Sequence, residues 1–229
     1  MRCRFYYHES AFYLTVLGLL TAFIRWCPAT PPLNSDIHSW SIAAVDYVYG
    51  EQYNDAEETA RKIIEKYPAH PAGYFFMALA IDSWMVAHVS DKKEEEFFRY
   101  CDLAVEKGEK ILDKNPKDEW ALFFIGGAEG YKGTFEARYG RWITAFRYGW
   151  KGVSVLMKLR DAKCDLVDID VGIGCYEYWR SALIKSLWWM PNVDDKRQEG
   201  IALVQKARKR VSEPAGRNAN EHRASPETI

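Results

Sequence analysis

Residues 53–68 read YNDAEETARKIIEKYP, and this stretch carries the pattern that decides the fold. Small or apolar side chains recur at Ala56, Ala60 and Ile63, with the spacing of one face of an amphipathic helix. Pro68 follows, and proline is poorly tolerated inside a helix. We therefore expect a helix over 54–67 that buries one face and ends before this proline.

The same pattern returns every 48 residues. The small residue recurs as Ala56, Ala104, Gly152 and Gly200, the later apolar residue as Ile63, Ile111, Leu159 and Ala207, and the closing proline as Pro68 and Pro116. The intervening helices align at an interval of 47, as Ala80, Gly127 and Gly174, as Trp84, Tyr131 and Tyr178, and as Met77, Phe124 and Val171. Small residues let two helix axes approach closely. We expect an all-α fold of four helical hairpins that share one core, because a single hairpin cannot bury its apolar face alone.

Helical periodicity covers almost every segment from Asp36 to Val211, without the alternation that marks strands. The expected helices are 36–50, 54–67, 71–89, 91–114, 117–138, 141–161, 165–189 and 193–211. Capping boxes are expected at Asn54 with Glu57 and at Asp91 with Glu94. The polar residues 212–229 read as a disordered tail.

These residues resemble the tetratricopeptide repeat family over roughly 36–211. The best copy is Tyr47, Tyr53, Ala56, Ala60, Ile63 and Pro68, and the second is Ala104, Gly108, Ile111, Leu112 and Pro116. Gly152, Leu156 and Leu159 form a third copy, and Gly200, Val204 and Ala207 a fourth. The resemblance implies an α-solenoid, a right-handed superhelix of paired helices. The family period is about 34 residues, so longer hairpins are expected here, and HEAT-type repeats are the alternative.

Three further segments, GGAEGYKGTFEARYGRWITAFRYGWKG (126–152), GIGCYEYWRSAL (172–183) and LWWMP (187–191), are similar to uncharacterised exported bacterial members of that family. The similarity implies fold and compartment but no activity.

The first 29 residues have the layout of a secretory signal. Arg2 and Arg4 precede the uncharged stretch AFYLTVLGLLTAFI (11–24), and Cys27 and Ala29 offer a small-residue cleavage site. The alternative is an uncleaved anchor through residues 11–26, although fourteen apolar residues are fewer than the roughly 20 of a membrane span. Residues 30–35 read as a linker to the repeat domain. We expect an exported protein, periplasmic or tethered to a membrane and facing the periplasm.

Composition argues against several function classes. The net charge is −1 with a pI of about 6.5, so the chain lacks the broad basic field of a nucleic-acid binder. The cysteines and histidines match no metal-site spacing. The stretch GGAEGYKGT (126–134) fails the spacing of a phosphate-binding loop, and no cofactor is expected.

Charged residues on the later inner helices are the candidate groove or ligand-binding residues: Glu129, Lys132, Glu136, Arg138, Asp170, Glu177 and Arg180. Glu129 and Glu136 share one helical face, and Asp170 and Glu177 have the same spacing on the next inner helix. Paired carboxylates suit acid–base chemistry. The alternative is local ion pairing, for example between Glu177 and Arg180 three residues apart.

Aromatic residues form a second set of signals. Trp142, Phe146 and Trp150 have the spacing of a buried helical stripe. Trp188 and Trp189 are adjacent, so they face different ways, and one is a candidate partner anchor. The cations of residues 206–210 suit a helix C-terminus, with a membrane-surface contact as the alternative.

The function that these patterns favour is a non-enzymatic scaffold that presents a concave helical groove to a protein or peptide. A small-ligand-binding protein with a pocket between the third and fourth hairpins is the alternative. A hydrolase that uses Glu129, Asp170 or Glu177 is a third hypothesis, and no nucleophile–histidine arrangement supports it.

Overall fold

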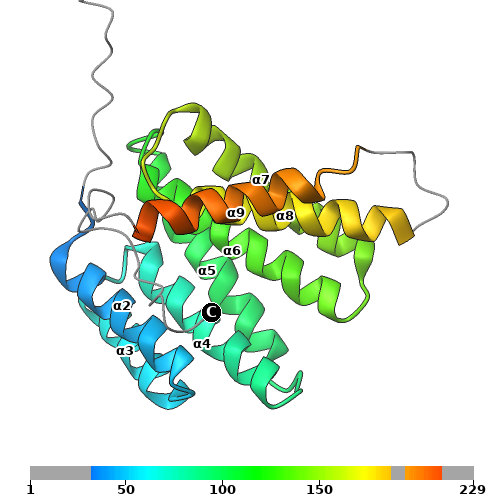
Figure 1. Cartoon of the computed structure of the whole chain (residues 1–229). Helices are drawn as coiled ribbons and strands as arrows, with labels where there is room; N and C mark the ends of the chain where they lie inside the picture. The colour runs from blue at the N-terminus through cyan, green and yellow to red at the C-terminus, as the bar shows by residue number, and fades with distance from the viewer. Residues whose placement is uncertain (1–31, 187–193, 213–229) are drawn as a thin grey trace, which may run out of the picture.

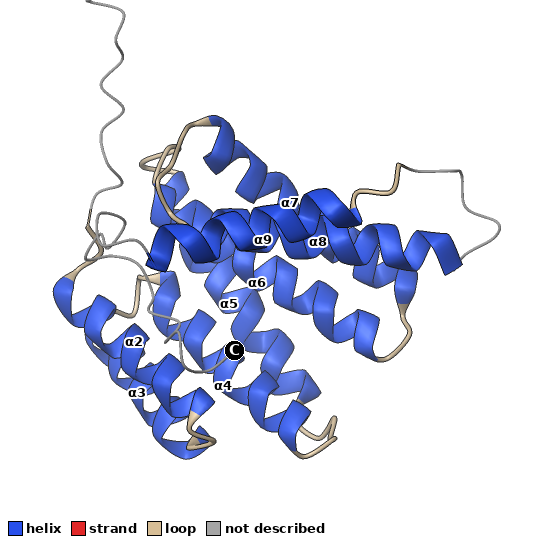
Figure 2. Ribbon diagram, in the orientation of Figure 1, coloured by secondary structure: helices blue, strands red, loops and turns tan. Residues whose placement is uncertain are grey.

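The computed structural model describes residues 32–186 and 194–212, and this part of the chain is helical without a strand (Figure 2). The helices are α2 (Ser35–Tyr49), α3 (Tyr53–Lys66), α4 (Pro71–Ala87), α5 (Glu94–Leu112), α6 (Glu119–Arg138), α7 (Trp142–Asp161), α8 (Asp168–Ser186) and α9 (Arg197–Ser212). The all-α prediction is confirmed, and within these ranges each helix matches an expected one within a few residues at its ends.

Side-chain caps begin three of the helices, at positions other than those expected. Asn34 Oδ1 accepts from Asp36 N–H at 3.0 Å, His70 Nδ1 from Ala72 N–H at 3.2 Å, and Asp118 Oδ1 from Ala121 N–H at 2.9 Å. The two expected capping boxes are wrong. Helix α3 already begins at Tyr53, so Asn54 lies inside it, and α5 begins after Lys93 without a side-chain cap.

The helices contact one another in a regular order (Figure 1). Each helix packs on its neighbours in the chain, and the even-numbered helices also pack in sequence: α2 on α4, α4 on α6, and α6 lightly on α8. Among the described helices, the main chains of the odd-numbered α3, α5, α7 and α9 approach closely only those of their chain neighbours, and Phe98 of α5 meets Tyr148 of α7 through side chains alone, with ring centres 6.2 Å apart. We call the even-numbered helices inner and the odd-numbered ones outer. Between the two rows lies a core rich in phenylalanine, with Phe76, Phe97, Phe124 and Phe135 almost fully buried.

Small residues set the closest helix crossings, as the repeat predicts. A Cβ atom added to Gly152 would lie 2.6 Å from the carbonyl oxygen of Gly126, and one added to Gly200 would lie 2.5 Å from that of Gly174. Main chain therefore meets main chain where α6 crosses α7 and where α8 crosses α9. Ala56 and Ala104, the earlier members of the series, are fully buried.

The interval expected for the inner helices needs a correction. The residue of α6 that faces Gly152 is Gly126, whereas Gly127 faces the ring of Phe75 on α4. Gly126 and Gly174 are 48 residues apart, so the inner helices repeat with the same interval as the outer ones. The 47-residue alignment chose the wrong member of a Gly-Gly pair, because both glycines are small and only their direction separates them.

The expected buried stripe on α7 is wrong in part. Trp150 is 60 % exposed and Trp142 is 37 % exposed, while Phe146 is half-buried. The side of α7 that faces α6 carries Ala145, Gly152 and Leu156 instead. The small-residue stripe takes the buried position, and the tryptophans turn away from it.

Several expectations lie outside the described residues. These are the signal or anchor over 1–29 with its candidate tether at 11–26, the pair Trp188 and Trp189, and the tail after Ser212. Within the described ranges, no helix combines the length and apolar character needed to cross a bilayer.

Candidate functional site

Lys132 is the most deeply buried of the predicted site residues, and it joins three helices. Its Nζ lies 2.9 Å from Asp102 Oδ1 on α5 and 3.2 Å from Glu129 Oε2 on its own helix α6. It also lies 4.7 Å from the ring centre of Tyr148 on α7. Burial lowers the pKa of Lys132, but the hydrogen bond to Asp102 and the charge of Glu129 outweigh this effect and raise it. The lysine is therefore held as a cation.

Glu136 forms a second ion pair in the region where α5, α6 and the start of α7 meet. Arg141, just before α7, donates through Nε to Glu136 Oε2 and through a terminal nitrogen to Glu94 Oε1 on α5 at 2.8 Å. Burial lowers the pKa of Arg141, and the bond to Glu136 raises it by more. Arg141 thus ties the end of α6 to the start of α5.

Arg138 reaches in another direction, to α4. One of its terminal nitrogens lies 2.8 and 3.0 Å from the two carboxylate oxygens of Asp82. Asp82 is buried, and burial raises its pKa, while Arg138 opposes this shift. The pair joins consecutive inner helices across a sequence distance of 56 residues.

The predicted residues of α8 form their own pairs. Asp170 Oδ2 accepts from Lys206 Nζ of α9 at 3.0 Å, and Glu177 Oε2 accepts from Arg180 at 2.7 and 3.1 Å. Glu177 and Arg180 lie 48 residues after Glu129 and Lys132. A glutamate and a basic residue three positions later therefore form an ion pair at the same repeat positions on α6 and α8.

These contacts show what the seven predicted residues do in the fold. The ion pairs of the α6 residues run to α4, α5 and the start of α7, and those of α8 run to α9 or within α8. Each predicted carboxylate has a cationic partner and is buried between helices. The geometry matches the ion-pairing interpretation, and it gives the charges a role in joining neighbouring helices.

Other side chains of the inner helices are exposed and take no part in these ion pairs. They include Val86 on α4, Thr134 on α6, and Cys175 and Trp179 on α8. Val86 and Thr134 are 48 residues apart, and Trp179 follows Tyr131 at the same interval. Tyr131 packs against Phe75 of α4, with ring centres 5.4 Å apart, whereas Trp179 is 61 % exposed because α8 touches α6 only lightly.

Neither Trp179 nor Thr134 is among the seven site residues predicted from the sequence. The 48-residue interval is the sequence signal that could have found both residues. It aligns Trp179 of α8 with Tyr131 of α6, and Thr134 of α6 with Val86 of α4. The 47-residue interval aligned Tyr178 with Tyr131 instead.

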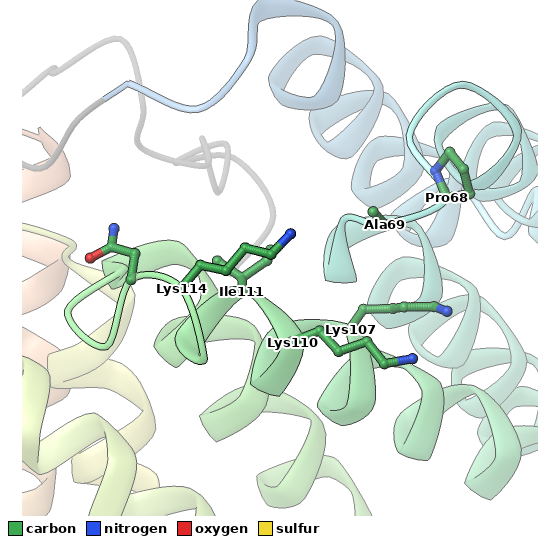
Figure 3. A pocket seen from close by; sticks show the side chains of 7 residues that line it. Pro68, Ala69, Lys107, Lys110, Ile111 and Lys114 are labelled. Carbon is green, nitrogen blue, oxygen red and sulfur yellow. The ribbon is translucent and has the colours of Figure 1, made fainter.

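A shallow depression of about 460 Å³ lies elsewhere, between the α3–α4 loop and the C-terminal end of α5 (Figure 3). Its lining is Pro68, Ala69, Lys107, Lys110, Ile111, Lys114 and Asn115. Lys107 and Lys110 both pair with Glu106, and Lys107 also lies 5.7 Å from the ring centre of Tyr74. Cations suit the end of a helix, so this cluster is accounted for by local electrostatics.

Within the described ranges, Cys101, Cys164 and Cys175 form no disulfide with one another, and no group of acidic, histidine and cysteine side chains is placed to hold a metal ion. Burial strongly raises the pKa of Cys101, so this thiol stays protonated.

Comparison with known proteins gives no relative for the chain: no family model, curated protein or solved structure matches it.

Proposed function

We propose that this protein is a non-enzymatic interaction scaffold, a right-handed α-solenoid of four tetratricopeptide-like hairpins, exported or tethered to a membrane. Its inner helices offer their free face to a protein or peptide. The proposal rests on the packing order of the helices together with the 48-residue repeat.

The packing order is the observation that carries the proposal. In the described part of the chain, the main chains of successive inner helices approach one another, whereas those of the outer helices approach closely only their chain neighbours. Each added hairpin therefore extends the stack by one step, which is how solenoid repeats produce an elongated face for partners.

Trp179 is the best anchor for a partner on that face. It combines a large apolar area with 61 % exposure on an inner helix. Tryptophan is enriched among the residues that dominate binding energies at interfaces. The charged pairs behind this face hold the helices in place rather than contact the partner.

The test compares two single substitutions in the full chain. Trp179→Ala removes the proposed anchor, and Trp150→Ala removes a tryptophan of equal exposure, 60 %, from outer helix α7. Peptides selected from a random display library on the wild-type protein provide the ligands, and their affinities are measured by fluorescence anisotropy. We expect Trp179→Ala to weaken binding about thirtyfold, with Trp150→Ala unchanged. The scaffold role is contradicted if no peptide is enriched, or if the two variants bind equally well.

Export has its own test. N-terminal sequencing of the protein isolated from its native cells should give either a start after Ala29 or an intact N-terminus in the membrane fraction. Intact chain found only in the cytosol would contradict this part of the proposal.

A further inference from the structure

The outer side of α7 carries an exposed stripe of apolar and basic side chains. It consists of Ile143, Arg147, Trp150, Lys151 and Lys158, and we call it the α7 outer stripe. Ile143, Arg147, Trp150 and Lys158 follow one another at spacings of four, three and eight residues, which places their side chains on one side of the helix. Ile143 is 80 % exposed and Trp150 is 60 % exposed. The main chain of α7 packs on α6 and α8, and the stripe lies away from both of these contacts. Tyr148, next to the stripe, also meets Phe98 of α5, with ring centres 6.2 Å apart.

The cations of this stripe are not used inside the fold. Within the described ranges, Arg147, Lys151 and Lys158 have no ionic partner. Arg147 and Lys151 instead lie over the ring of Tyr148, at 5.3 and 5.8 Å from its centre. The carboxylate that reaches this region from α5, Asp102, is bound to Lys132. The stripe therefore presents unneutralised positive charge beside an exposed indole.

The repeat itself shows that stacking does not require this chemistry. The positions 48 residues earlier, on outer helix α5, hold Glu95 where α7 has Ile143 and Asp102 where it has Trp150. Both acids are exposed. An equivalent outer helix thus carries acids at these two places, while Arg99 and Lys110 stand at the places of Arg147 and Lys158. The basic side chains therefore recur in the repeat, and it is the tryptophan and isoleucine of α7 that need another explanation.

The charge of the whole chain points the same way. Residues 32–141 contain 13 Lys and Arg against 20 Asp and Glu, whereas residues 142–212 contain 13 against 8. The near-neutral net charge therefore combines an acidic segment, 32–141, with a basic segment, 142–212. The stripe lies in the basic segment, which attracts anionic surfaces and turns the stripe toward them.

We propose that the α7 outer stripe docks on the surface of an anionic lipid bilayer. Tryptophan prefers the water–lipid interface, where its apolar ring enters the headgroup layer and its N–H stays hydrated. Arg147, Lys151 and Lys158 bind acidic headgroups, and Ile143 adds apolar area. This contact is separate from the peptide-binding face, because it uses an outer helix and leaves the inner helices free.

The experiment measures binding of the full chain to phosphatidylcholine vesicles with and without phosphatidylglycerol, by co-sedimentation. The measured quantity is the excess binding to the anionic vesicles, because apolar residues 11–24 are common to all variants. We expect Arg147→Glu/Lys151→Glu/Lys158→Glu to lower this excess at least about tenfold. Raised salt should lower it for the wild type. Trp150→Ala should weaken binding to both kinds of vesicle.

Two matched variants serve as controls. Lys107→Glu/Lys110→Glu/Lys114→Glu makes the same change in net charge at the C-terminal end of α5 and just after it, and Trp179→Ala removes an equally exposed tryptophan from an inner helix. Circular dichroism checks that each variant is folded. The proposal is overturned if the α5 variant loses as much excess binding as the α7 variant, or if the wild type has no excess. It is also overturned if the α7 variants change only the oligomeric mass in sedimentation velocity, which would make this face a protein contact.

Discussion

At the scale of single residues, His70 is the group whose titration bears most directly on stability. Its ring caps α4 by accepting from Ala72 N–H, and its edge packs on Phe124 with ring centres 5.8 Å apart. Burial lowers the pKa of His70 to about 4, and the nearby charge of Asp118 opposes this shift only in part. The folded state therefore holds the imidazole neutral.

This arrangement predicts a loss of stability in weak acid. The unfolded chain binds a proton near pH 6.5, while the folded chain resists it down to about pH 4. Stability is thus present above pH 6.5 and is lost as the pH falls through this window. His70→Asn keeps a capping oxygen and cannot titrate. Urea unfolding at pH 7.5 and 5.0 should show a smaller acid loss in this variant than in the wild type. An equal loss in both proteins would show that His70 is not responsible.

Lys132 gives a second prediction at this scale. Lys132→Met should destabilise the fold by about 3–5 kcal/mol, because it leaves Glu129 buried without a cation. Asp102 is largely exposed and tolerates the loss of its partner. The double variant Lys132→Met/Glu129→Leu should recover most of the stability, as measured by urea unfolding. If the double variant is no more stable than the single one, the burial of Glu129 is not what makes Lys132 necessary.

At the scale of helix pairs, the glycines predict opposite effects for the same substitution. Gly152→Ala would force a Cβ atom against the main chain of Gly126 and Gly130, and should cost about 1–3 kcal/mol. Gly130→Ala has nothing within 4 Å of the added atom and should stabilise the helix by about 0.5–1 kcal/mol. Thermal unfolding of both variants measures the difference. Destabilisation of equal size at both sites would contradict the crossing geometry.

The helix pairs also show which features of the fold the sequence predicts and which it does not. Pro68, Pro71 and Pro116 marked helix ends well, because proline restricts the main chain wherever it occurs. The choice between Gly126 and Gly127 failed, because two adjacent glycines have the same size and differ only in direction. Trp150 was expected to be buried because its spacing fits a core stripe, but Gly152 and Leu156 take that side. The predicted carboxylates are paired, and spacing along the helix indicates two of these pairs, Glu129 with Lys132 and Glu177 with Arg180, each three residues apart. The pairing of Asp170 with Lys206 of α9 depends on how the helices pack and has no such local signal.

At the scale of the whole molecule, stability should vary along the stack. Inner helices α4 and α6 have contacts on several sides, whereas α9 packs on α8 alone among the described helices. Amide hydrogen exchange followed by mass spectrometry should therefore show the slowest exchange in α4 and α6 and faster exchange in α9. Exchange at one common rate in all helices would mean that the fold opens as a single cooperative unit.

The two glycine crossings have a consequence for how this protein can change. At α6–α7 and α8–α9 the two helices approach so closely at these glycines that main-chain atoms of one helix leave no room for a Cβ atom on the other. Substitutions at Thr134, Cys175 or Trp179 can therefore change the proposed partner surface without moving the helices that carry it. The protein can acquire a new specificity while its architecture stays constant.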